Sequence, residues 1–394
     1  MSDPPRLSPP EYEPSEPLTV LPADLEPIPA RPALPQPGFW LAVALSLLLV
    51  ISQLIIAVVV LTVMLVAAGA APVNVKELTG SALLILASTA ATTVVAVGIA
   101  VVFHRSQTRR RLALRGFHPF QFLVIVLLAL PLQVVAGATA NLVADGLFRF
   151  EGFREFYEMQ SRFFQDFSRE FWLLVILGGC LLPGLGEEIF YRGLVSRGVV
   201  ARNGVVFGTI LTALLFGLVH IEPIQASGAA LIGIGFQVVF LTTRSLLAPI
   251  FLHALNNGLA FVAMRWLAPG TAEPLAGLGV AADHAGRWLG GGLLNPAEKL
   301  ALFQLIDRPP WLVTLTAVAA VAALFLLLYE MRTRWRLPDG TPWSPGYVTA
   351  EMPPASLGAV TRLETPSLWT VLVALAALGT FVFVLVDRVE AAAG

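Results

Sequence analysis

The chain is organised around the stretch Gly186-Glu187-Glu188-Ile189-Phe190-Tyr191-Arg192, which places two adjacent carboxylates and an arginine in an otherwise apolar setting. Apolar runs of membrane character lie on both sides, at residues 171–177 and 205–207. A charged side chain at the depth of a lipid bilayer is costly, so an acidic residue inside a membrane segment indicates a functional site. Two adjacent acidic residues strengthen that indication.

Helical geometry separates the roles of these three charged residues. On a helix, Glu188 and Arg192 are four positions apart and can form an ion pair in the favourable order, with the acid nearer the N-terminus. Glu187 lies about 100° further round the helix, because a helix has about 3.6 residues per turn, so it has no arginine of its own. A carboxylate without a charged partner is suited to act as a general base. We interpret Glu188 and Arg192 as a structural ion pair and Glu187 as the residue that performs chemistry.

The composition is that of an integral membrane protein. The 394 residues are 56% hydrophobic and 13% charged, with a mean hydropathy of +0.77, whereas soluble domains carry about 25% charged residues. The net charge of −1 gives no general attraction to nucleic acid, which is not expected as a partner. Cys180 is the only cysteine, which excludes an intrachain disulfide and any metal site with several cysteines.

A membrane span needs about 20 mostly apolar residues, and only helices or closed barrels satisfy the backbone in lipid. The apolar runs are too long for barrel strands, so the sequence predicts an all-α polytopic bundle of about nine spans, within a range of eight to ten. We place them near 39–68, 80–103, 120–148, 171–199, 205–221, 228–243, 246–267, 311–329 and 367–386. Gly178-Gly179 and Pro183-Gly184 predict a break in the fourth span, with a second helix starting just before Glu187.

The chain is expected to divide into six segments. Residues 1–37 are a disordered, proline-rich cytoplasmic tail without a signal peptide, and 38–148 hold the first transmembrane helices. Residues 149–170 form an amphipathic interfacial segment, rich in phenylalanine and arginine. A helical core at 171–267 carries the motif, 268–310 form a loop, and 311–394 hold the last transmembrane helices with a loop between them.

Basic residues predict the orientation and the location. Arginines gather after the second span (105–115) and after the eighth (332–336), which marks the cytoplasmic side and places the N-terminus inside. Lysine occurs only at Lys76 and Lys299. We interpret this preference for arginine as the mark of a high-GC bacterial genome, and we expect the protein in the bacterial inner membrane.

Three further polar residues lie on apolar helices. His220 follows Phe216 by four positions, and Asn257 follows His253 by four, so each pair shares a helix face. A histidine and an amide on one face can donate two hydrogen bonds to a developing oxyanion. A histidine opposite a carboxylate can help to deprotonate a water molecule. In a nine-span arrangement His220 lies near the outer end of its helix, so we expect that the fifth span extends beyond His220 or is tilted.

Three motifs together, E-E-x-x-x-R at 187–192, F-x-x-x-H at 216–220 and H-x-x-x-N at 253–257, resemble the CPBP family. This family comprises the CAAX prenyl endopeptidases and the bacteriocin-processing or immunity (Abi) proteins. The stretch from Thr243 to Ile250 is also similar to that family, and the resemblance covers roughly residues 170–265.

The resemblance implies an intramembrane, glutamate-dependent endopeptidase. On the matching positions, Glu187 would be the general base, His220 would help to activate the water, and His253 with Asn257 would stabilise the oxyanion. The substrate would be a membrane-associated protein or peptide, met at the lipid bilayer. Because a bacterial origin is expected, a processing or immunity role fits better than the maturation of prenylated proteins.

Two alternatives remain open from the sequence. Glu187, His220 and His253 could form the two-histidine, one-carboxylate set of a catalytic zinc. The motif H-E-x-x-H is absent and Asn257 would then be idle, so we expect no cofactor and keep zinc as the alternative. The second alternative is a non-enzymatic scaffold, immunity protein or transporter in which the same charges only hold helices together.

Overall fold

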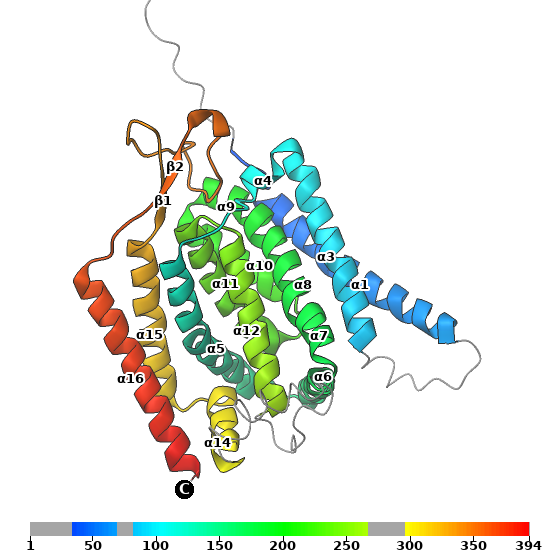
Figure 1. The fold of residues 1–394 in the computed structure, drawn as a ribbon. Coiled ribbons are helices and arrows are strands. Elements are labelled where there is room, and N and C mark those ends of the chain that lie inside the picture. The colour runs from blue at the N-terminus through cyan, green and yellow to red at the C-terminus, as the bar shows by residue number, and fades with distance from the viewer. Residues whose placement is uncertain (1–33, 69–81, 267–295, 394) are drawn as a thin grey trace, which may run out of the picture. The chain divides into compact units, whose positions relative to one another are not determined.

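The structure is a computed structural model, and it describes residues 34–68, 82–266 and 296–393 (Figure 1). The predicted proline-rich tail, residues 1–37, and the predicted loop, residues 268–310, lie largely outside the described residues.

The described chain is a bundle of long apolar helices, as predicted. Eight of the helices in these residues are long and apolar enough to cross a membrane, and the shorter α10 adds a ninth apolar helix. These nine are α1 (Phe39–Ala68), α3 (Ala82–His104), α5 (Pro119–Leu147), the helix Trp172–Asn203, α10 (Val205–Leu218), α11 (Pro223–Thr243), α12 (Leu247–Trp266), α15 (Trp311–Glu330) and α16 (Leu368–Ala393). The all-α polytopic bundle is confirmed, and the protein is an integral membrane protein.

The predicted break in the fourth span is wrong, because the chain stays helical from Trp172 to Asn203. Two wider, π-helical segments, η2 (Val175–Leu181) and η3 (Ile189–Val195), alternate with α7 (Trp172–Leu174), α8 (Leu182–Glu188) and α9 (Ser196–Asn203). π-Helical turns absorb irregularities inside helices and are frequent at functional sites. The helix therefore continues through these residues, with Gly178 and Gly179 in the π-helical segment η2 and Pro183 at the start of α8.

Glycine lets the motif helix pack closely against α3. A Cβ placed on Gly186 would lie 2.9 Å from Thr93 Oγ1 and 3.0 Å from Thr93 Cα. The Thr93 hydroxyl donates a hydrogen bond of 2.9 Å to the carbonyl of Leu182 on the motif helix. Gly186 thus permits the contact that fixes the start of the acidic motif.

Short elements lie outside the long helices. They are η1 (Arg105–Gln107), α4 (Thr108–Arg111), α6 (Glu151–Ser168), α14 (Pro296–Asp307), η5 (Ala355–Leu357), and the strands β1 (Thr333–Arg336) and β2 (Val360–Leu363). Helix α6 occupies the segment predicted to be an amphipathic interfacial helix. The strands pair antiparallel, with Thr333 opposite Leu363.

Two of these elements correct the predicted loops. Residues 296–307 of the predicted loop 268–310 form α14, because Ala301 and Leu305, four positions apart, are buried in one cluster with Val313 and Phe381. Strand β2 lies in the predicted loop between the last two spans, where it gains a backbone partner in β1. These short elements depend on tertiary contacts rather than on a strong pattern of their own.

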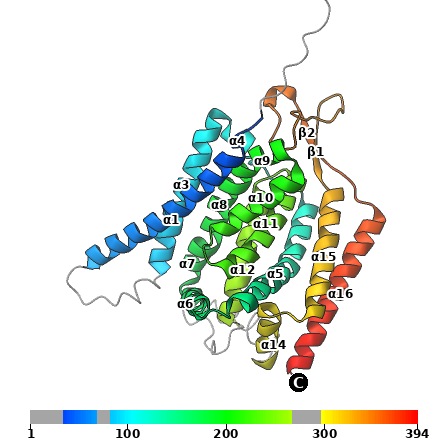
Figure 2. The same cartoon turned by 180° about the vertical axis from the view of Figure 1, so that it is seen from behind.

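One end of the bundle is rich in arginine, and we call it the arginine-rich end. It comprises residues 104–118, 196–204, 243–247 and 331–367, and both ribbon views show α4, α9, β1 and β2 there (Figures 1 and 2). Within it, Arg115 donates hydrogen bonds to the carbonyls of Thr243 and Arg244. Buried Glu351 pairs with Arg197 on α9 and with Arg110.

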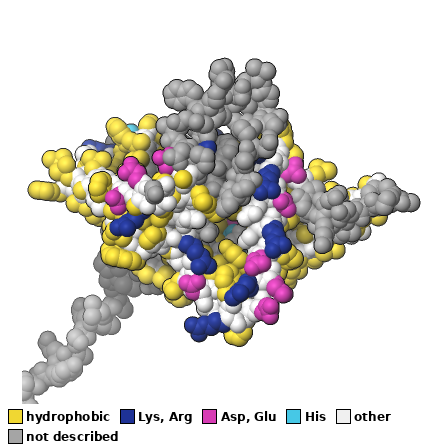
Figure 3. Space-filling view, turned by 90° about the horizontal axis from the view of Figure 1, so that it is seen from below, with side chains coloured by type: hydrophobic (Ala, Val, Ile, Leu, Met, Phe, Trp, Pro, Cys, Tyr) yellow, Lys and Arg dark blue, Asp and Glu magenta, His cyan; other side chains and the backbone are white. Residues whose placement is uncertain are grey.

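The opposite end comprises residues 147–172, 218–223 and 296–310. Helices α6 and α14 lie there in both ribbon views, and Arg265 of α12 donates hydrogen bonds to the carbonyls of Ser168 and Glu170. Viewed from below, the side chains of Lys and Arg are interspersed with those of Asp and Glu among hydrophobic groups (Figure 3). The two ends therefore differ in charge.

Candidate active site

A buried chain of charged groups joins two of the sequence motifs. Glu188 Oε1 lies 2.7 Å from Arg192 Nη1 and 3.0 Å from His253 Nδ1. Glu188 and Arg192 have no exposed surface, and His253 is 4% exposed. Charges this deeply buried are stable only when they are paired and hydrogen-bonded. Glu188 therefore contacts His253 of a second motif as well as Arg192 of its own motif.

Helix α11 completes the surroundings of this chain with two groups. The Arg192 guanidinium donates a second hydrogen bond, of 2.7 Å, to the carbonyl of Gly233. A Cβ at Gly233 would lie 3.2 Å from Arg192 Nη2, so a larger residue would crowd this contact. The ring of Phe236 stacks on His253 with a centroid distance of 4.9 Å.

Phe216 lies between the two histidines. Its ring meets that of His220 edge to face at 5.4 Å and that of His253 at 5.8 Å. The Arg192 guanidinium lies over the same ring, 4.6 Å from its centre. The F-x-x-x-H motif therefore does more than fill space, because its phenylalanine fixes the spacing of the two imidazoles and adds a cation–π contact.

Each imidazole has its Nδ1 atom held by the protein. His220 Nδ1 lies 3.2 Å from the carbonyl of Phe216, and His253 Nδ1 faces the carboxylate of Glu188. Both partners accept hydrogen bonds, so each Nδ1 carries the proton. The Nε2 atom of a neutral ring is then an acceptor, which suits proton transfer. Asn256, next to motif residue Asn257, is also buried, and its Oδ1 has no hydrogen-bond partner among the described residues.

His220 is placed by a tight turn rather than by a longer helix. Helix α10 ends at Leu218, so the fifth span does not extend beyond His220, and of the two expected alternatives the tilt of this span stays a prediction. Ile221 then adopts a φ of +62°, a strained value for a β-branched residue. Glu222 follows and caps α11, accepting hydrogen bonds from the backbone N–H groups of Ile224 and Gln225. Helix α11 accordingly begins at Pro223, before the predicted start at 228.

Replacing Ile221 by glycine is expected to stabilise the fold. The side chain is 53% exposed, so little packing is lost, while glycine adopts positive φ without strain. We expect the free energy of unfolding to rise by about 1 kcal/mol, measured by thermal unfolding in detergent. Ile221→Val keeps the strain and is expected to leave the stability within about 0.5 kcal/mol of the original. Equal melting temperatures for the glycine and valine variants would show that this turn is not strained.

Unlike Glu188, Glu187 forms no ion pair with an arginine among the residues that the structure describes. Its side chain is half-buried, and its Oε2 atom is buried without a hydrogen-bond partner among the described residues. Buried polar atoms in proteins are nearly always hydrogen-bonded, and an exception calls for an explanation by water, ligand or catalysis. A water molecule held by this carboxylate is one such explanation.

Asn257 connects α12 to the motif helix. Its Nδ2 atom donates a hydrogen bond of 3.0 Å to the carbonyl of Gly179. Pro183 lies four residues after Gly179 and has no N–H to donate to that carbonyl. The Asn257 amide thus takes the place of the N–H that Pro183 lacks. Side chains of neighbouring helices do the same around prolines in other membrane helices. A side-chain amide has two N–H groups, so the second one remains for another acceptor.

The structure does not gather Glu187, His220 and His253 as metal ligands. No group of three or more His, Cys, Asp or Glu side chains in residues 34–68, 82–266 and 296–393 is arranged to hold a metal ion. The zinc alternative has no support in the arrangement of these three side chains.

Some residues of the site were not found from the sequence. Gly233 and Phe236 belong to α11, a helix without a motif, and only the three-dimensional packing brings them to Arg192 and His253. Glu222 could have been predicted as the N-cap of α11, because an acidic residue directly before a proline is typical of a helix start.

Part of the chain is similar to a known protein family. Residues 169–259 match the model of the family described as type II CAAX prenyl endopeptidase, Rce1-like. The matched residues include all seven motif positions, namely Glu187, Glu188, Arg192, Phe216, His220, His253 and Asn257. No curated protein and no solved structure matches the chain. This match over residues 169–259 supports the resemblance to the CAAX endopeptidases that the three motifs indicate.

Proposed function

We propose that this chain, a CAAX-protease-like membrane protein by its family match, hydrolyses a peptide bond of a membrane-associated protein or peptide with a water molecule activated by Glu187 and His220. The family supports a membrane protease in general. The observation that carries the finer proposal is the pair of imidazoles on either side of Phe216, each with Nδ1 held so that Nε2 can meet a reacting group.

The proposed reaction needs no covalent intermediate with the protein. Glu187 takes a proton from water, assisted by His220, and the water oxygen attacks the carbonyl carbon of the scissile bond. His253 and Asn257 donate hydrogen bonds to the oxyanion that forms. Glu187 then returns the proton to the leaving nitrogen, the C–N bond breaks, and a carboxylic acid and an amine are released.

Glu188 and Arg192 act on this reaction through His253. The carboxylate of Glu188 orients the ring by accepting a hydrogen bond from Nδ1, and a ring that carries a proton on both nitrogens can donate Nε2–H to the oxyanion. Arg192 balances the charge of Glu188 and links it to α11 through Gly233. We therefore assign both residues to the positioning of His253, in addition to holding the helices together.

The direct test is proteolysis of a mass-tagged peptide library by the purified protein. We expect cleavage by the unsubstituted chain and a loss of about a hundredfold or more in His220→Ala. His118→Ala is a matched control, because His118 lies at the start of α5 and caps that helix. Absence of cleavage by folded, unsubstituted protein across a broad library would favour a binding or immunity role on the same fold.

We also propose that the arginine-rich end faces the cytoplasm. This end carries twelve arginines in its described segments: Arg105, Arg109, Arg110, Arg111, Arg115, Arg197, Arg202, Arg244, Arg332, Arg334, Arg336 and Arg362. Such an excess of arginine is typical of cytoplasmic segments. The Arg202 guanidinium also donates a hydrogen bond to the carbonyl of Pro35, so the first described residues lie at this end. His220 and α6 would then lie toward the outer face.

Labelling with a membrane-impermeant maleimide in intact bacterial cells tests the orientation. Cys180 is buried and is the only native cysteine, so new cysteines report alone. We expect labelling of Glu155→Cys on α6 and no labelling of Ser344→Cys in the loop after β1 until the cells are opened. The reverse pattern would show that the arginine-rich end faces outward.

A further inference from the structure

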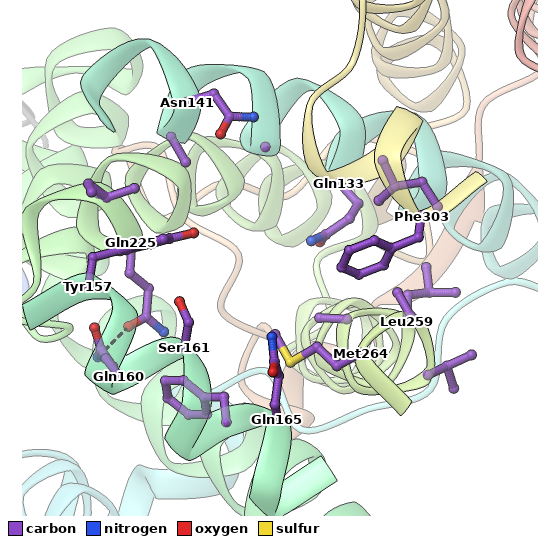
Figure 4. A pocket seen from close by; sticks show the side chains of 18 of the residues that line it. Gln133, Asn141, Tyr157, Gln160, Ser161, Gln165, Gln225, Leu259, Met264 and Phe303 are labelled. Carbon is purple, nitrogen blue, oxygen red and sulfur yellow. Dashed lines mark hydrogen bonds between the residues drawn. The ribbon is translucent and has the colours of Figure 1, made fainter. Parts of the chain in front are cut away.

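A cavity of about 710 Å³ opens between helices that include two of those carrying the motifs or following them, α11 and α12 (Figure 4). It is bounded by α5, α6, the start of α11, the second half of α12 and α14. Two of its lining residues adjoin the motifs in sequence: Glu222 is two positions after His220, and Leu259 is two positions after Asn257. Its volume lies within the range of about 300–1,000 Å³ that is usual for ligand sites.

Side-chain amides are the distinctive polar groups of this cavity. They come from α5, α6 and α11, and they are Gln133, Asn141, Gln160, Gln165 and Gln225. Gln160 donates a hydrogen bond of 3.0 Å to Gln225, which Figure 4 draws as a dashed line. An amide carries both donors and an acceptor, as a peptide group does. The lining is therefore suited to hydrogen-bond a polypeptide backbone.

Gln133 gives the second, independent indication of a polar ligand. It lies at the midpoint of α5, fourteen residues from both Pro119 and Leu147. Its Oε1 atom is buried and has no hydrogen-bond partner among the described residues. An unsatisfied amide in an apolar region is costly, and polar residues within membrane helices mark ligand paths. A ligand with a hydrogen-bond donor would satisfy this atom.

The charges of the cavity argue against an ionic ligand. Among the described residues that line it, Lys299 and Glu222 alone carry a formal charge at neutral pH, and their charges are opposite. Both carboxylate oxygens of Glu222 already accept hydrogen bonds from the start of α11. The remaining lining consists of apolar and neutral polar groups, which can accommodate the side chains of an extended peptide between the amides.

We propose that this cavity binds an extended polypeptide segment of the substrate through its backbone, without a requirement for an attached lipid chain. The inference rests on the proposed endopeptidase function and specifies its substrate class. The segment enters from the opposite end of the bundle, where α6 and α14 line the cavity, and runs toward His220 and Asn257. An alkyl chain would leave the amide of Gln133 without a partner.

Binding without cleavage tests this proposal on the full chain. Glu187→Gln protein, held in lipid nanodiscs, is incubated with a mass-encoded library of unmodified short peptides and with the same peptides carrying a farnesylated C-terminal cysteine. Retained peptides are quantified by mass spectrometry. The added substitution Gln133→Met or Gln165→Met keeps the side-chain length and removes one amide, and Ser161→Trp fills the cavity from α6.

The matched control is Gln53→Met on α1. Gln53 Oε1 is also buried without a partner among the described residues, but Gln53 does not line the cavity. We expect Gln133→Met and Gln165→Met each to weaken retention of unmodified peptides about fivefold, the effect of about 1 kcal/mol for one hydrogen bond. Ser161→Trp should abolish retention, and Gln53→Met should leave it unchanged.

Three other results would overturn the proposal: retention of farnesylated peptides alone, retention that is insensitive to Gln133→Met and Ser161→Trp, or no retention of either library. Cleavage by the unsubstituted chain is measured in parallel. Cleavage that does not depend on the amides removes the cavity proposal and leaves the proposed function standing. Amide-dependent retention without any cleavage would support the cavity proposal and contradict the proposed endopeptidase function.

Discussion

Glu187→Gln is expected to reduce peptide cleavage by about 10⁴-fold while the protein stays folded. Glu187 is proposed both to take the proton from water and to return it to the leaving nitrogen, and general acid–base catalysis contributes about 10²–10⁴-fold. Glutamine has the same shape, and Glu187 Oε2 has no hydrogen-bond partner to lose among the described residues. The rate is measured by mass spectrometry of the products, and the fold by thermal unfolding.

The neighbouring carboxylate supplies the contrast for this prediction. Glu188→Gln removes the charge that pairs with Arg192 and the carboxylate that accepts a hydrogen bond from His253, so it should lower the melting temperature as well as the rate. Glu187→Gln should lower the rate alone. If Glu187→Gln retained a tenth or more of the original rate, Glu187 would not be the base.

Arg192→Met is expected to destabilise the protein by about 3–5 kcal/mol. Breaking a buried ion pair on one side leaves the other charge without compensation, and the cost is of this size. Here Glu188 would remain fully buried, and the hydrogen bond to the carbonyl of Gly233 and the contact with the ring of Phe216 would also be lost. Thermal or denaturant unfolding in detergent measures the change.

Arg362→Met on β2 is the control for this substitution. Arg362 is exposed, and its replacement is expected to change the stability by no more than about 0.5 kcal/mol. Similar melting temperatures for Arg192→Met and the original protein would mean that the pair with Glu188 does not hold the bundle together.

The helical architecture could be predicted because its cause lies within each segment. Runs of about 20 apolar residues must form helices in lipid, and this requirement alone gave the bundle. The continuous helix from Trp172 to Asn203 could not be predicted, since Gly178, Gly179 and Pro183 usually end helices. There the amide of Asn257 on α12 donates a hydrogen bond to the carbonyl of Gly179, four positions before Pro183, and replaces the N–H that Pro183 lacks.

Local sequence was also insufficient for the elements that depend on partners. Helix α14 is short, and its burial against α15 and α16 is what fixes it. Strand β1 requires β2, almost thirty residues later in the chain. These pairings bring together segments whose own patterns are weak.

The motifs predicted which polar residues the candidate site contains, but not how they connect. Spacing by four residues suggested the approach of Glu188 to Arg192, as the structure has it. The contact of Glu188 with His253 joins helices 65 residues apart in the sequence, and the strained turn at Ile221 that places His220 has no sequence signal. Such contacts depend on how the helices pack against one another, and the pattern of a single sequence does not reveal that packing.

Chelation of the active protein tests the central claim, metal-free activation of water by Glu187, most directly. The cleavage rate of one peptide from the library is measured before and after exhaustive dialysis against a strong zinc chelator, with the metal content determined on the same samples. We expect an unchanged rate in the unsubstituted protein at less than stoichiometric metal, and the same reduction of about 10⁴-fold in Glu187→Gln in either state. A rate that is lost on chelation and restored by zinc would contradict the account and make the protein a metalloprotease.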